Sequence, residues 1–236
     1  MSNIWSSSYK AIQICNQYLA EFQGLTFDEL KLNDDYRAQM FRYTNSFKEA
    51  RFLRAYFYFN LVRAYGDVPY FTEMVTTDQV NSLTRTPAQE IFNAIIAECD
   101  KLSTELPADY TKLGLDGIAP AENGRVTCYA ALALKARAAL YAASPLFNPE
   151  NNKDLWRRAA EANKEVIETC TANGFKLSKY SELWGPNNWS NNEMIFVRRY
   201  NGNISTLEEY NFPMGVPGGN SGNCPTQNMV DAYEMK

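Results

Sequence analysis

Residues 47–69 read FKEARFLRAYFYFNLVRAYGDVP, and this stretch decides the fold. Before its Gly-Asp-Val-Pro end it is apolar on nearly every face, so we expect a helix that neighbouring helices bury on most sides. The turn from Gly66 to Pro69 ends it, because proline cannot continue a helix and glycine accepts the reversal. Arg51 and Arg54 are interpreted as structural, forming buried ion pairs and hydrogen bonds that fix the fold.

The same pattern extends towards the N-terminus, over residues 36–65, as one long helix or two abutting ones. Apolar residues at spacings of three and four predict further helices over 3–23, 86–106, 127–143 and 154–171. In the last of these helices we expect an inward face made of Trp156, Ala159, Ala160, Asn163, Val166, Ile167 and Cys170.

Helix starts and small residues add to this prediction. Thr86 and Pro87, with Gln89 completing a capping box, predict the start of the 86–106 helix. Thr127 opens an alanine-rich helix, whose small residues allow another helix backbone to approach closely. Helix pairs of this kind resemble tetratricopeptide-like hairpins, here with irregular repeat lengths. We therefore predict a mainly α fold of degenerate tetratricopeptide-like helical hairpins with long loops and little β structure.

The character of the chain changes after residue 174. Only 193–197 is interpreted as a short strand there, and 211–225 is a loop rich in Gly, Pro and Asn. No linker is evident. We expect one domain over 1–236, with a helical-repeat core over about 1–174 and a loop-rich segment over 175–236.

Composition excludes several function classes. The 23 basic and 27 acidic residues are mixed, so no basic block favours nucleic acid. The absence of histidine removes Ser-His and Cys-His catalysis and His-ligated metals. The five cysteines form no CxxC pair, so neither a disulfide framework nor a zinc site is expected: Cys15, Cys99, Cys128, Cys170 and Cys224. The four that lie in predicted helices, all but Cys224, are interpreted as small buried thiols. No cofactor and no metal are expected.

Four ordered motifs carry a family resemblance. Residues 48–69 closely resemble the signature helix of the SusD/RagB family, which is rich in Arg and aromatic residues and ends in Gly-Asp/Asn-Val-Pro. Residues 140–160 are similar to the family's alanine-rich helix, Leu-Phe-Asn loop and following Trp helix. Residues 192–197 resemble its N-E-x-I-F strand, and 225–235 resemble a segment near the middle of full-length members.

The resemblance implies a non-catalytic protein on the outside of the outer membrane that captures oligosaccharide or polysaccharide; some members take peptide. It also implies a partner, a SusC-type TonB-dependent transporter that receives the cargo. Members carry a signal and a lipid-bearing cysteine, and residues 1–20 lack a signal-peptide pattern. The chain is therefore expected to be the N-terminal portion of such a lipoprotein, with the signal removed, and the sequence leaves open whether residues 1–236 hold the whole ligand site.

Two groups of residues are candidates for ligand binding. In the family, the loop that follows the Gly-Asp-Val-Pro turn lies near the sugar site, which nominates Tyr70, Phe71, Glu73 and Asn81. Chemistry alone nominates Trp184, Asn187 and Trp189 in a Trp-Gly-Pro-Asn-Asn-Trp loop. Aromatic rings stack on the C–H faces of sugars, while amides form hydrogen bonds with hydroxyl groups.

The same residues bear on two alternative functions. A helical-repeat protein could instead bind peptide or protein ligands on a concave surface. A carboxylate-dependent glycosidase is disfavoured, because adjacent acids such as Glu208 and Glu209 are more often solvated than catalytic. Residues 148–159 lack the glycine and final acidic residue of a calcium loop, so they are interpreted as a polar loop that caps a helix.

Overall fold

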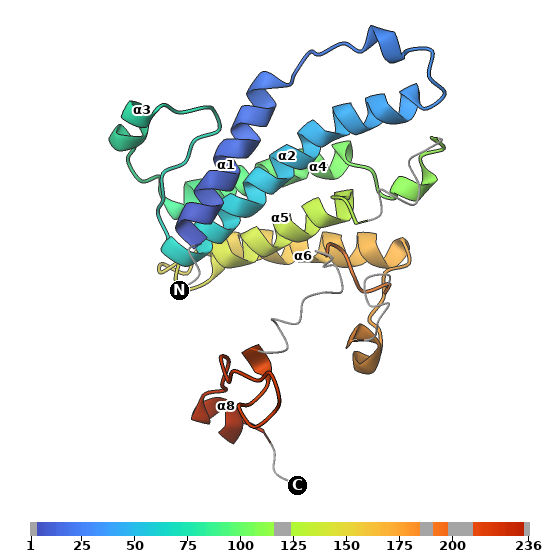
Figure 1. Cartoon of the computed structure of the whole chain (residues 1–236). Coiled ribbons are helices and arrows are strands. Elements are labelled where there is room, and N and C mark those ends of the chain that lie inside the picture. Colours follow the sequence, from blue (N-terminus) through green and yellow to red (C-terminus); the bar gives the residue numbers. More distant parts are fainter. Residues whose placement is uncertain (1–3, 116–123, 185–190, 198–209, 234–236) are drawn as a thin grey trace. The chain divides into compact units, whose positions relative to one another are not determined.

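A computed structural model describes residues 4–115, 124–184, 191–197 and 210–233 (Figure 1). The described chain is mainly helical, which confirms the predicted fold class. Its α-helices are α1 (Ile4–Glu21), α2 (Tyr36–Tyr65), α3 (Thr77–Ser82), α4 (Ala88–Glu105), α5 (Cys128–Ala143), α6 (Lys153–Ala172) and α8 (Gln227–Asp231). Short 3-10 helices are η1 (Asp28–Leu30), η2 (Tyr110–Lys112) and η3 (Tyr180–Trp184).

The expected strand at 193–197 is wrong, because those residues form turns and bends. In the described part of the chain, β pairing is limited to one antiparallel bridge between Val68 and Thr86. The predicted helix over 36–65 is a single helix, α2. Within the described ranges no helix is long and apolar enough to span a bilayer.

The chain divides by its internal contacts into two units, residues 1–197 and 198–236. The second unit, where described, is a loop closed on itself and followed by α8. The Ser221 amide donates to the Phe212 carbonyl (2.9 Å), and the Asn223 amide donates to the Tyr210 carbonyl (3.0 Å). The expectation of a single domain over the whole chain stays a prediction.

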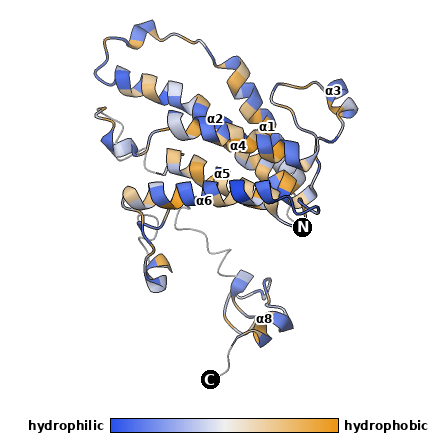
Figure 2. Ribbon diagram, turned by 180° about the vertical axis from the view of Figure 1, so that it is seen from behind, coloured by the Kyte–Doolittle hydropathy of each residue, from blue (hydrophilic) through white to orange (hydrophobic). Residues whose placement is uncertain are grey.

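In the first unit, each long helix packs against the next along the chain. α1 lies against α2, α2 against α4, and α5 is held between α4 and α6 (Figure 1). Hydrophobic and hydrophilic residues alternate along these helices (Figure 2), and the buried hydrophobic residues of all of them join in one core cluster. The largest fully buried side chains come mostly from α2 and α4: Phe52, Tyr58, Phe59, Leu61, Ile91, Phe92, Ile95 and Leu102.

Small side chains set the spacing of α4, α5 and α6. α5 buries its alanines on both sides, including Ala131, Ala138 and Ala143, which are fully buried. α6 contributes the buried residues Ala159 and Ala162. Small residues on facing helices let the backbones approach and leave few voids.

The predicted inward face of α6 is wrong at Trp156, Ala160 and Ile167, which are all exposed. Trp156 is 37% exposed and Ile167 is 65% exposed, while Ala159, Ala162 and Cys170 are buried. The alanine-rich surface of α5 accepts small side chains at close range, so α6 is rotated to present its small residues there. Periodicity shows that a helix has an apolar side, but here the shape of the neighbouring helix selects which residues face it.

The predicted capping box of α4 is also wrong. The Asp67 carboxylate accepts a hydrogen bond from the Ala88 amide at 2.8 Å, across 21 positions of sequence. The Gln89 side chain donates instead to the carbonyls of Ala142 (2.7 Å) and Phe147 (2.8 Å) and so ties α4 to the end of α5. The capping box that does form belongs to α3, where Thr76 and Gln79 bond to each other's backbone amides.

Two basic side chains link the helices. Arg51 on α2 pairs with Glu98 and Glu105 of α4, both at 2.6 Å, which confirms the structural interpretation of this arginine. Lys135 on α5 pairs with Asp100 of α4 (2.5 Å) and Glu165 of α6 (2.8 Å). Lys135 is 15% exposed, so its pairs are screened less than ordinary surface pairs.

The four cysteines in helices are buried or partly buried, as expected. All five are free thiols; Cys15, Cys99 and Cys170 are buried, Cys128 is partly buried and Cys224 is exposed. Burial raises the pKa of the Cys99 thiol to about 12, so it stays protonated at neutral pH. Within the described residues no cluster of Cys, Asp and Glu could hold a metal ion.

The Asp67 cap yields a prediction. Asp67→Ala removes the acceptor for the Ala88 amide, so the free energy of unfolding should fall by about 1 kcal/mol. Asp67→Asn keeps an acceptor oxygen at the same place and should lie within a few tenths of a kcal/mol of the wild type. Urea denaturation followed by far-UV circular dichroism measures both. Equal losses for the two variants would show that the cap is not the source of stability.

Candidate functional site

The loop between α2 and α4 starts and ends at the same place on the helical layer. Gly66 takes a positive φ of 68°, which turns the chain out of α2. Val68 is fully buried, and its carbonyl accepts the Thr86 amide at 3.0 Å. This bridge and the Asp67 cap hold the two ends of the intervening segment together. Residues 69–86 therefore form a loop that is closed at its base, and we call it the α2–α4 loop.

Side chains of α2 fix the backbone of the first part of this loop. The Tyr58 hydroxyl donates to the Phe71 carbonyl (2.6 Å) and accepts from the Phe71 amide (2.9 Å). Arg54 donates to the Thr72 carbonyl at 2.7 Å. Tyr58 is almost completely buried, so these bonds are sheltered from water.

Side chains of α1 fix the same segment from the other side. The Tyr9 hydroxyl donates to the Pro69 carbonyl at 2.8 Å. The Asn16 amide donates to the Glu73 carbonyl at 2.9 Å, while its carbonyl oxygen accepts from Arg54, also at 2.9 Å. Burial raises the pKa of both Tyr9 and Tyr58 well above the usual value, so both phenols remain neutral hydrogen-bond donors.

A small cavity of about 120 Å³ lies beneath this fixed segment, between α2, α4 and the loop. Its polar side chains are those of Arg51, Arg54, Tyr58, Tyr70, Thr72 and Glu98. The Tyr70 ring lies 4.6 Å from the Tyr58 ring, centroid to centroid, and the Tyr70 hydroxyl makes no hydrogen bond to the described residues. Glu98 is held by Arg51 at 2.6 Å. We call this cavity the Tyr70 pocket.

The Tyr70 pocket can recognise hydroxyl groups. A carboxylate accepts hydrogen bonds, a guanidinium donates them, and a phenol does either. Because the loop backbone is already bonded to α1 and α2, these groups are in place before a ligand arrives, and little ordering is left for binding to impose.

The four candidates on the α2–α4 loop occupy different positions. Tyr70 lines the pocket and is half-buried. Phe71 packs its ring on Tyr9, 5.9 Å between centroids, and so serves mainly to anchor the loop. Glu73 and Asn81, the latter on α3, are exposed. The binding role of these four residues stays a prediction.

The second group of candidates, Trp184, Asn187 and Trp189, cannot be assigned to this pocket. Trp184 ends η3, and its side chain lies outside the described residues, as do Asn187 and Trp189. Figures 1 and 2 place α3 and the η3 segment at opposite ends of the helical layer. Sequence reasoning missed Glu98, whose polar position on α4 gave no signal of a site, and it assigned Arg54 a structural role only.

A second and larger hollow, of about 650 Å³, lies near the other end of α2. Its walls come from residues 107–113, 124–125, 127, 129, 173–175, 191–192 and 194–197, and we call it the α5–α6 hollow. Asn191 and Asn192, which line it, follow one residue after the Trp-Gly-Pro-Asn-Asn-Trp loop in the sequence.

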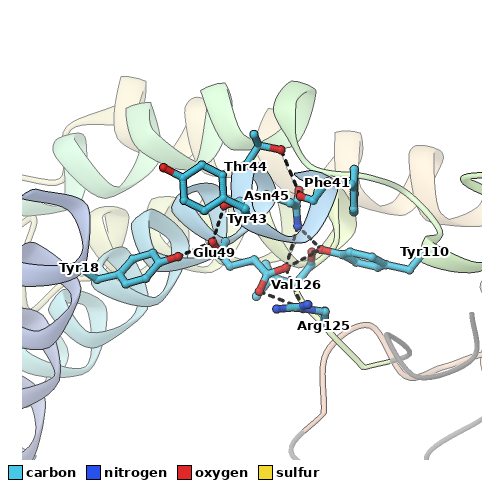
Figure 3. A network of polar contacts seen from close by, with 10 residues as sticks. Tyr18, Phe41, Tyr43, Thr44, Asn45, Glu49, Tyr110, Arg125 and Val126 are labelled. Atoms are coloured by element: carbon cyan, nitrogen blue, oxygen red, sulfur yellow. Dashed lines mark hydrogen bonds and ion pairs between the residues drawn. The ribbon is translucent and has the colours of Figure 1, made fainter. Parts of the chain in front are cut away.

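A polar network braces one wall of the α5–α6 hollow (Figure 3). Asn45 on α2 donates to Glu49 (2.7 Å) and to the Tyr110 hydroxyl (2.8 Å), and that hydroxyl lies 2.8 Å from the Val126 carbonyl. Arg125 pairs with Glu49 at 3.1 Å. Burial, reinforced by the Glu49 charge, raises the pKa of Tyr110 and keeps its phenol neutral.

Comparison with known proteins decides the family. A family model described as "Starch-binding associating with outer membrane" matches residues 1–140, more than half of the chain. The chain belongs to the SusD-like family. This is a family of glycan-binding proteins, not of enzymes, and its description associates it with the outer membrane.

Individual relatives agree with this assignment. SusD-like protein P2 of Formosa agariphila is 26% identical over 210 residues, which cover 87% of this chain and 35% of that protein. A SusD-like carbohydrate binding protein of Bacteroides fragilis is 28% identical with a TM-score of 0.60, covering 82% of this chain and 32% of that structure. A laminarin binding SusD-like protein is 25% identical with a TM-score of 0.58, covering 83% and 37%. The SusD-like chain spans about a third of the length of its curated relatives, 31% and 35%.

The anchoring of the α2–α4 loop yields a second prediction. Tyr58→Phe removes one hydroxyl and leaves the amide and carbonyl of Phe71 without their partner, so the free energy of unfolding should fall by about 1–2 kcal/mol. Tyr56→Phe is the matched control on the same helix, because Tyr56 is 37% exposed and should change stability by less than about 0.5 kcal/mol. Hydrogen exchange should also rise at residues 70–73 in Tyr58→Phe alone. Unchanged exchange there would contradict the anchoring role.

Proposed function

We propose that this SusD-like chain captures an oligosaccharide at the α2–α4 loop, without chemical turnover, as part of a surface-exposed outer-membrane lipoprotein. The lipoprotein would then deliver the sugar to a SusC-type TonB-dependent transporter. The observation that carries the capture step is the Tyr70 pocket, where a half-buried ring lies beside a carboxylate and a guanidinium on a loop fixed from two helices.

Each pocket residue has a distinct part in the proposed capture. Tyr70 offers an aromatic face to the C–H face of a sugar ring and a free hydroxyl to its edge. Glu98 accepts from sugar hydroxyls, and Arg54 donates through the nitrogens that do not bond the loop. The pocket is small and lies at the surface, which suits an affinity low enough for the cargo to be released.

The pocket supports capture better than hydrolysis. Glycoside hydrolysis uses two carboxyl groups on opposite sides of the scissile bond, roughly 5–10 Å apart. Of the described residues that line the Tyr70 pocket, Glu98 alone has a carboxyl group, and Arg51 already holds it. The family's description as starch-binding and the laminarin binding relative both favour a glycan as the cargo.

Native affinity electrophoresis tests the capture step. The purified chain is run through gels that contain starch, laminarin, xylan or galactomannan, with reducing sugar assayed in parallel. We expect retardation by one of these polysaccharides and no release of reducing ends. Tyr70→Ala should weaken the interaction about tenfold, which corresponds to about 1.4 kcal/mol, and Glu98→Gln should also weaken it.

Tyr233→Ala is the control, because Tyr233 is 70% exposed and lies in the second unit. Equal retardation of the wild type and Tyr70→Ala would remove the Tyr70 pocket from the proposal. Competition by peptides, with no retardation by any polysaccharide, would favour a helical-repeat protein that binds peptides. Release of reducing sugar would favour a glycosidase.

Delivery makes a separate prediction. The full-length lipoprotein, purified from detergent-solubilised outer membranes with an affinity tag, should bring a TonB-dependent transporter with it, identified by mass spectrometry. Recovery of the lipoprotein alone, under conditions in which it still binds glycan, would contradict delivery to a transporter and leave capture intact.

A further inference from the structure

The α5–α6 hollow is large enough for a ligand and distant from the Tyr70 pocket. Its volume of about 650 Å³ lies within the range of about 300–1,000 Å³ that small-molecule sites occupy. Along α2, Asn45 contacts the wall of the hollow while Tyr58 contacts the α2–α4 loop. At about 1.5 Å per residue these two contacts are separated by roughly 20 Å, so one sugar unit cannot occupy both places.

The charges that line the hollow are already paired within the protein. Three charged residues line it: Asp109, Lys112 and Arg125. Asp109 pairs with Lys112 at 3.3 Å, and Arg125 pairs with Glu49 at 3.1 Å. No charge in the described lining therefore awaits a counterion, and a ligand with a net charge would find no opposite charge to offset the loss of its hydration.

Neutral hydrogen-bonding groups remain available in the lining. The Tyr129 side chain is only 6% exposed, yet its hydroxyl makes no hydrogen bond to the described residues. Asn191 is held by its carbonyl oxygen, which accepts from Ser178 (2.6 Å) and from the Glu193 amide (2.9 Å), and this leaves its NH₂ group to donate. The NH₂ group of Asn173 donates to the Thr169 carbonyl, which leaves the side-chain oxygen of Asn173 to accept a hydrogen bond.

Aromatic surface completes the lining. The Tyr129 and Phe175 rings meet edge to face, 4.9 Å between centroids. Phe196 rests edge-on against Phe52 of α2 at 5.5 Å and remains 41% exposed. Fixed rings beside uncharged amides and a phenol match the alternating C–H faces and hydroxyl edges of a sugar.

From this lining we infer that the α5–α6 hollow is a second carbohydrate site, which takes an uncharged sugar unit. This inference rests on the proposed function, since it adds a second contact point for the glycan that the Tyr70 pocket captures. Two weak sites on one chain would hold a polysaccharide longer than either site alone, because the second contact becomes intramolecular once the first is made.

Isothermal titration calorimetry with short sugars tests the inference. Maltotriose and laminaritriose are the probes; trigalacturonate and a triglutamate peptide are the charged controls. We expect the wild type to bind two molecules of one neutral trisaccharide. The Tyr70→Ala, Glu98→Gln double variant should bind one.

In the double variant, adding Tyr129→Phe should weaken the remaining binding about fivefold, because one hydrogen bond is lost while the ring stays. Tyr141→Phe is the matched control on the same helix, since Tyr141 does not line the hollow, and it should leave that binding unchanged. Thermal unfolding confirms that both variants remain folded.

The outcomes separate the two proposals. Loss of all sugar binding in the double variant would overturn the second site and leave the proposed function standing. Binding of neither trisaccharide by the wild type would overturn the second site as inferred here. Only together with retardation by none of the four polysaccharides would it overturn the proposed function as well. Residual binding of trigalacturonate or of the peptide in place of a neutral sugar would overturn the assignment to uncharged sugars.

Discussion

The backbone of residues 69–73 lies outside regular secondary structure, and its polar groups need partners from elsewhere in the protein. A loop that packs onto a helical layer loses water, and each unpaired amide or carbonyl would cost free energy. Tyr58 and Arg54 of α2 and Tyr9 and Asn16 of α1 supply the partners. This requirement explains why two largely apolar helices carry these polar residues, and the shape of the Tyr70 pocket depends on it.

The helical layer meets a different constraint, the close approach of α4, α5 and α6. Alanines on facing surfaces allow that approach, and Lys135 joins the three helices through Asp100 and Glu165. Close packing leaves each helix few alternative positions. The Tyr70 pocket lies where the α2–α4 loop covers the middle of α2 and α4, and the α5–α6 hollow lies near the end of α4, the start of α5 and the end of α6.

Local signals in the sequence predicted the helices well. The bounds of α2 and the Thr127 cap of α5 follow from periodicity and from residues that start or stop helices. Features that depend on distant partners were missed. The cap of α4 comes from Asp67 and not from Thr86, and Trp156 on α6 is exposed because α5 selects smaller neighbours. Tyr70 was nominated through a family resemblance. Glu98 was missed because it reaches the pocket from another helix, and the sequence around it contains no signal of a binding site.

The bridge between Val68 and Thr86 has a consequence for how this protein can diversify. The entropy of closing a loop grows only with the logarithm of its length, about 0.6 kcal/mol for each doubling. With its two ends fixed by the bridge and by Asp67, the α2–α4 loop can lengthen, shorten or change sequence while the helices keep their contacts. Related chains could thus exchange ligand preferences on one scaffold, and engineered loops could be grafted between the same two anchor points.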